Sequence, residues 1–115
     1  MGLLADVVFT EFKNYLKDGL VKKVFLVKEL DDPDRKGRKL LGYIKNGIIY
    51  VSNDQCQHEK LKTFLHELAH AVFIYAPEKH IAKVEDFLWK KLSRKQKKYL
   101  EKWIPKKISR APVRY

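Results

Sequence analysis

The sequence is poor in cysteine and has no long apolar run. Cys56 is the only cysteine among the 115 residues, so the chain cannot form an internal disulfide or a zinc site built from several thiolates. No apolar run approaches the roughly 18 residues of a transmembrane helix. The first residues show neither the pattern of a signal peptide nor that of a myristoylation site. We therefore expect a cytoplasmic protein without a membrane partner.

Acidic residues are nearly missing from the last quarter of the chain. Residues 1–87 hold 14 Lys and Arg against 13 Asp and Glu, whereas residues 88–115 hold 11 Lys and Arg against the single Glu101. Most of the net charge of +11 therefore lies in this last segment. Such a segment is typical either of a surface for nucleic acid or another acidic partner, or of a solvated helical face and tail.

The order of apolar patterns predicts a single α+β domain over residues 1–115. Apolar residues recur at helical spacing over residues 3–17, 78–92 and 93–103, and over the helix that follows residue 57, while residues 24–27, 40–45 and 48–52 have strand patterns. Asn46-Gly47 predicts a tight hairpin between the last two strands, and Ser93 with Gln96 predicts a capping box. We expect a small three-stranded antiparallel or mixed sheet packed on a central helix, with further helices N- and C-terminal to it.

The strand over residues 48–52 directly precedes the central helix. Placed at the sheet edge, this strand would be able to bind an extended peptide by strand addition. A position in the middle of the sheet would make it an ordinary structural strand, and the sequence leaves both positions open.

The central helix contains the motif His66-Glu67-Leu68-Ala69-His70. At 100° per residue, His70 lies about 40° and Glu67 about 100° around the helix from His66, so the three side chains leave one side of it. Two imidazoles one turn apart are typical of a zinc site, and the glutamate between them is typical of the general base of a metallopeptidase.

The other residues of this helix are nearly all apolar, which predicts a buried helix. Leu61, Leu65, Leu68, Val72 and Tyr75 fall on the side opposite His66. Ionisable groups on a buried helix need partners. A metal ion would satisfy both imidazoles at once, and a hydrogen-bonded structural cluster is the alternative.

A catalytic zinc ion usually takes three protein ligands, so the motif needs a third one. The downstream candidates are His80, Glu85 and Asp86. If two antiparallel helices meet near Pro77, the second helix returns to the level of His70 near Glu85. Glu85 then fits directly, and His80 fits if the first helix ends early.

The string HELAHAVF, the strands in front of it and the chain length resemble the minigluzincins, small soluble zinc peptidases of the gluzincin group. The resemblance implies a zinc ion held by His66, His70 and a third histidine, for which His80 is the only downstream candidate, with Glu85 as the alternative. It also implies latency, in which a C-terminal segment, here residues 93–115, covers the cleft within one molecule or across a homodimer.

The predicted function is zinc-dependent hydrolysis of peptide bonds, with a water activated by the metal and Glu67 as general base. Peptides or unfolded proteins are the expected substrates, and nucleic acid is not the expected partner. The alternative is a zinc-bound but catalytically silent protein whose basic C-terminal part binds nucleic acid or an acidic partner.

Overall fold

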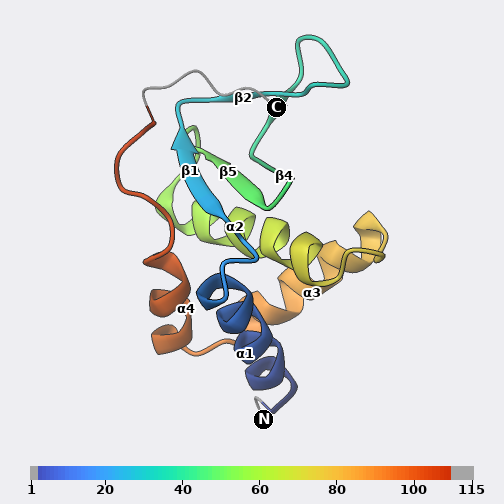
Figure 1. Ribbon diagram of the computed structural model, residues 1–115, viewed down its shortest axis with the longest axis vertical. Helices are drawn as coiled ribbons and strands as arrows, with labels where there is room; N and C mark the ends of the chain where they lie inside the picture. Colours follow the sequence, from blue (N-terminus) through green and yellow to red (C-terminus); the bar gives the residue numbers. More distant parts are fainter. Residues whose placement is uncertain (1–2, 110–115) are drawn as a thin grey trace.

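The structure, a computed structural model, describes residues 3–109 and contains four helices and two small sheets in that range (Figure 1). The elements in chain order are α1 (Leu3–Lys17), β1 (Lys23–Val27), β2 (Leu30–Asp31), β3 (Lys39–Leu40), β4 (Gly42–Lys45), β5 (Ile48–Ser52), α2 (Gln57–Val72), α3 (Glu78–Lys91) and α4 (Arg94–Glu101). The predicted α+β class is confirmed. None of the described helices is long and apolar enough to cross a membrane.

The main sheet has three strands in the order β1-β5-β4 and is mixed. β1 runs parallel to β5, and β4 runs antiparallel to β5. The β4–β5 hairpin turns at Asn46 and Gly47, whose φ angles of 53° and 78° are the positive values that a type I′ turn requires. The hairpin prediction is therefore confirmed. β2 and β3 form a separate two-stranded ladder next to the main sheet.

β5 is the central strand of the main sheet, so the strand-addition hypothesis for residues 48–52 is wrong. Both of its edges are already paired, with β1 and with β4. The strand beside the metal motif that keeps an open edge is β4. Ser52 N donates to Leu41 O at 2.8 Å, so Leu41 directs its backbone groups toward β5. In an antiparallel pair this direction recurs at every second residue, so Tyr43 and Lys45 also direct their backbone groups toward β5. By the alternation of an antiparallel ladder, Gly42 and Ile44 direct their backbone groups toward the open edge.

One apolar core joins the sheet to all four helices. The sheet lies along one side of α2, and α1, α3 and α4 lie on its other side (Figure 1). The largest fully buried side chains include Phe12 of α1, Ile49 of β5, Phe64 and Leu68 of α2, Ile81 and Leu88 of α3, and Leu100 of α4. Burial of these side chains holds α2 between the sheet and the other three helices. The position of the helix that carries the motif is therefore fixed by the core.

Residues 93–109 complete this core. Ser93 caps α4 and forms the predicted capping box with Gln96. Leu100 and Ile104 are buried in the core, and Ser109 N donates to Leu26 O of β1 at 2.7 Å. The segment therefore packs against α1, α2 and β1. The rest of the predicted latency segment, residues 110–115, lies outside the described residues.

Candidate metal centre

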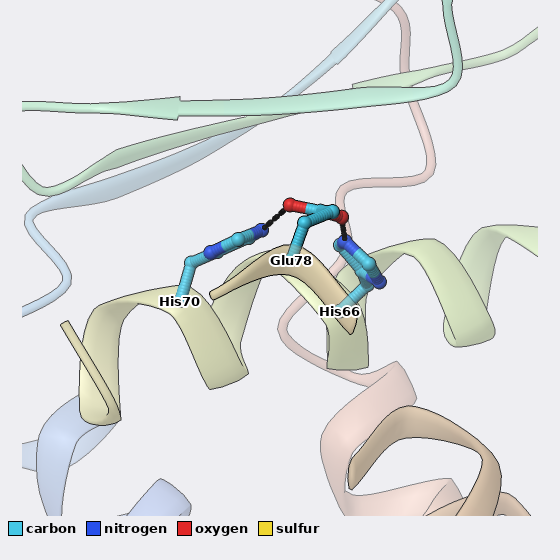
Figure 2. Close-up of side chains that lie close together, drawn as sticks. All are labelled: His66, His70 and Glu78. Atoms are coloured by element: carbon cyan, nitrogen blue, oxygen red, sulfur yellow. Dashed lines mark hydrogen bonds and ion pairs between the residues drawn. The ribbon is translucent and has the colours of Figure 1, made fainter. Parts of the chain in front are cut away.

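His66 and His70 point their Nε2 atoms to the same place above α2 (Figure 2). Their ring centroids are 4.9 Å apart, and their side chains are 19% and 27% exposed. The two rings are thus partly buried, and both line a hollow at the surface. This is the arrangement that the spacing of the motif predicts.

The third residue at this place is Glu78, the first residue of α3. Its carboxylate lies between the two rings, with Oε2 2.8 Å from His70 Nε2 and Oε1 in contact with His66 Nε2 (Figure 2). The three ligand atoms lie within 4.8 Å of one another, so His66, His70 and Glu78 are close enough to hold one metal ion. Two imidazoles and one carboxylate form a donor set that fits a catalytic zinc site.

Glu78 reaches this position because α2 ends earlier than the sequence pattern predicts. The helix stops at Val72, and Phe73 caps its end with a non-helical φ of −110° and ψ of 63°. The chain therefore reverses near residue 74 rather than near Pro77. Glu78 and His70 are then separated from the reversal by the same number of residues, on opposite sides of it. The first turn of α3 therefore lies at the level of His70.

The early end of α2 also corrects the expectation for Tyr75. Tyr75 was predicted on the buried side of the helix, but it lies beyond the helix end and is 94% exposed. Ile74 beside it is 66% exposed. The segment between α2 and α3 is therefore a surface turn.

His80, which the resemblance indicates as the third ligand, is not brought into this group. Within residues 3–109, the group of three that fits a metal ion is completed by Glu78 instead. His80 is exposed on the first turn of α3, where its backbone N–H donates to Pro77 O. The reversal near residue 74 explains this, because it puts position 78, not position 80, at the level of His70.

Glu85, the alternative third ligand, contacts the other nitrogen of the first histidine. Its Oε1 accepts a hydrogen bond from His66 Nδ1 at 2.8 Å. Nδ1 lies on the side of the imidazole ring away from the converging Nε2 atoms. Glu85 therefore occupies the place of a carboxylate that orients a ligand histidine, as in carboxylate–histidine–zinc triads. The third candidate, Asp86, is exposed and pairs with Lys90 on α3.

The pKa of His66 is raised to about 9. The largest cause is the hydrogen bond to Glu85, and the nearby carboxylates of Glu67 and Glu78 add to it, whereas burial lowers the pKa. The surroundings of His66 thus favour a positive charge at this place. The same negative charges would favour a metal cation at Nε2, where the Glu78 carboxylate lies.

Glu67 is the most buried ionisable group of the site, with 8% of the residue exposed. Burial is the main reason that its pKa is raised to about 7; His66 lowers it, and Glu78 and Glu85 raise it further. The carboxyl group thus holds a proton more readily than an exposed glutamate does. A general base benefits from a pKa close to the working pH.

The site opens into two adjoining hollows between β4 and the helices. Both are lined by Gly42 and Arg38 together with His66, Glu67 and Glu78. One hollow continues toward Lys62 and Thr63, and the other toward Tyr43 and His70. The surface is therefore hollowed on both sides of Glu67. None of the residues 93–109 lines either hollow.

Gly42 of β4 allows the sheet edge to lie directly against α2. A Cβ atom at this position would overlap the γ-methyl group of Thr63 and lie 3.1 Å from Glu67 Oε2. Any larger residue would therefore push β4 away from the helix or displace the carboxylate of Glu67. Gly42 sets the width of the gap between the strand edge and the site.

Comparisons of the chain with family models, with curated proteins and with solved structures find no match. The assignment of the site therefore depends on its own geometry.

Neither Glu78 nor Gly42 was predicted from the sequence as part of the site. Glu78 stood in the same downstream segment as His80 and Glu85, and the signal for it was its place directly after Pro77 at a helix start. Gly42 carried no local signal, because its role is visible only when β4 and α2 are packed together.

Proposed function

We propose that the protein is a zinc-dependent endopeptidase whose metal ligands are His66, His70 and Glu78. The observation that carries this proposal is the convergence of both Nε2 atoms and the Glu78 carboxylate within 4.8 Å, next to a buried Glu67. A structural cluster of histidines and carboxylates would satisfy the same side chains. The metal site is favoured because His66, His70 and Glu78 also line an open hollow that a substrate would be able to enter.

The third ligand distinguishes this site from that of the family it resembles. The motif and the order of the elements resemble those of minigluzincins. That resemblance implied a histidine as the third zinc ligand. A glutamate is the third ligand that most other gluzincins use. The proposed ligand set therefore supports a relation to the wider gluzincin group more than to the minigluzincins.

Zinc at this place would polarise the scissile carbonyl and lower the pKa of the attacking water. In the proposed reaction Glu67 accepts a proton from the attacking water as the water oxygen adds to the carbonyl carbon. Glu67 then delivers this proton to the amide nitrogen as the C–N bond breaks. The low exposure and raised pKa of Glu67 suit both transfers near neutral pH. Glu85 keeps the Nδ1–H of His66 engaged, so that the lone pair of Nε2 would be available to a metal ion.

The substrate is proposed to be an extended peptide that lies along β4. The outward backbone groups of Gly42 and Ile44 offer hydrogen bonds to a strand added at this edge. Because hollows adjoin the site on both sides, a chain would be able to continue in both directions from the cleaved bond. This favours an endopeptidase over an enzyme that removes single terminal residues.

The proposal is tested with purified full-length protein loaded with zinc. We expect one zinc ion per chain by elemental analysis, and cleavage of an unfolded protein that stops when a chelator removes the metal. Glu67→Gln is the matched control, since it should keep the zinc and lose the cleavage. Tight zinc binding without cleavage of unfolded proteins or peptides would favour the catalytically silent alternative.

Latency remains a prediction based on the family resemblance. The described part of the C-terminal segment supports the core, so its removal at Ser93 would unfold the protein rather than activate it. Latency across a homodimer is testable without truncation. Specific activity should rise on dilution if a second molecule covers the cleft, and should stay constant if it does not.

A further inference from the structure

The proposed function leaves unexplained a group of cations around α4. Two hollows that share Lys98 and Lys102 lie there. Together they are lined by six cations, which we call the α4 basic surface: Lys60, Arg94, Lys95, Lys98, Lys102 and Lys106. Among the described residues that line these hollows, Glu101 alone is acidic.

Three of these cations form a stripe along one helix face. Lys95, Lys98 and Lys102 are separated by three and four residues, so their side chains follow one another along α4. Lys60 of α2 and Lys106, which follows α4, extend the stripe sideways. Separate parts of the chain therefore supply cations to one surface.

The six cations have no acidic partners within residues 3–109. None of them takes part in an ion pair there, and none lies over an aromatic ring. Five of the six are exposed, and Lys60 is half-buried. Their positive charges are thus directed to solvent, where they add up to an attractive field for a polyanion.

The surface is separate from the metal centre. α4 lies near the start of α2, whereas His70 and Glu78 lie at the end where α2 turns into α3 (Figure 1). None of the six cations lines the hollows at the site. A ligand on the α4 basic surface would therefore leave the cleft open.

Two of the aromatic rings near this surface, those of Trp89 and Tyr99, are already engaged within the protein. Trp89 has Lys97 and Lys62 over its ring at 4.1 and 5.6 Å, and His58 packs edge-on against it. Tyr99 packs against Phe9. Trp89 and Tyr99 therefore do not offer free faces for bases, and Trp103, which follows Lys102, is 36% exposed. With six cations and one partly exposed ring, the surface is suited mainly to contacts with a phosphate backbone.

We propose that the α4 basic surface binds the phosphate backbone of nucleic acid without sequence preference. Five of its six cations are lysines, a residue type that is depleted in protein–protein interfaces but typical of phosphate-binding surfaces. The site is a second binding function and does not depend on the metal centre.

The test measures binding of a labelled DNA duplex of about 20 base pairs by fluorescence anisotropy at several salt concentrations. Six phosphate contacts correspond to a slope of log K against log salt of about −5. We expect Lys98→Glu/Lys102→Glu to weaken binding at about 50 mM salt at least tenfold and to reduce the slope by about 2. Lys60→Gln/Lys106→Gln, which leaves α4 intact, should reduce the slope similarly.

Lys36→Glu/Lys45→Glu is the matched control, because it changes the net charge equally but lies outside the α4 basic surface. An equal loss of binding in this control would overturn the proposal, since only net charge would then matter. Binding of polyglutamate as tight as that of the duplex would also overturn it, in favour of an acidic protein partner. Glu67→Gln should bind the duplex as the unmodified protein does.

Discussion

Glu85 Oε1 lies 2.8 Å from His66 Nδ1, on the side of the ring away from the site where the Nε2 atoms of both histidines converge. The two glutamates of α3 therefore contact different nitrogens of His66: Glu78 contacts Nε2 and Glu85 contacts Nδ1. Glu78 shares the converging site with the histidines, and Glu85 holds one of them in position. Because the two residues are seven positions apart, they lie on the same face of α3, two turns from each other.

Replacement of Glu85 should weaken zinc binding without abolishing it. Carboxylates that orient ligand histidines typically account for about 10–100-fold in metal affinity. We expect Glu85→Ala to lose this amount in a zinc competition titration, and Glu85→Gln to lose less, because its amide oxygen still accepts from His66 Nδ1–H. Asp86→Ala, at the exposed neighbouring position, is the control and should bind zinc normally.

Proteins with Glu78 or His80 replaced should differ sharply in zinc content. Glu78→Ala removes one of the three proposed ligands and should leave less than stoichiometric zinc after dialysis against a weak chelator. His80→Ala should retain one zinc ion per chain, because His80 is exposed and outside the group. The reverse result by elemental analysis would establish the histidine as the ligand and show that the Glu78 assignment is wrong.

Glu67→Gln should separate zinc binding from catalysis. The amide has nearly the shape of the carboxyl group but cannot accept a proton from water, so the rate of peptide cleavage should fall by a factor of about 100 or more. Zinc content and the thermal unfolding temperature should stay close to those of the unmodified protein. Activity near the original level would exclude Glu67 as the general base.

Gly42→Ala should reduce activity because it increases the spacing between β4 and α2. The added methyl group meets the γ-methyl of Thr63 and approaches the Glu67 carboxylate, so we expect slower cleavage and a lower unfolding temperature with zinc still bound. Thr63→Ser removes the opposing methyl group and keeps the hydroxyl that donates to Gln55 Oε1. The double variant should recover part of both losses, whereas simple additivity would argue against a steric cause.

The elements were predictable where local chemistry determines them. The helix at residues 3–17, the turn at Asn46-Gly47 and the capping box at Ser93 all depend on residues close together in the chain, and all three are confirmed. The end of α2 was not predictable in this way. Apolar residues continue to Tyr75 at helical spacing, but the chain leaves the helix at Phe73, and this shift of a few residues changed the third member of the site.

The sequence by itself determined that His66, Glu67 and His70 leave one side of a helix, because the period of an α-helix fixes that relation for any helix of this sequence. Only the tertiary structure decided which downstream residue joins them. The contacts of Glu78 with both histidines, of Glu85 with His66, and of Gly42 with α2 all join separate elements. Their distances follow from where α2 ends and how closely β4 and α3 pack against it, and this packing depends on the whole core.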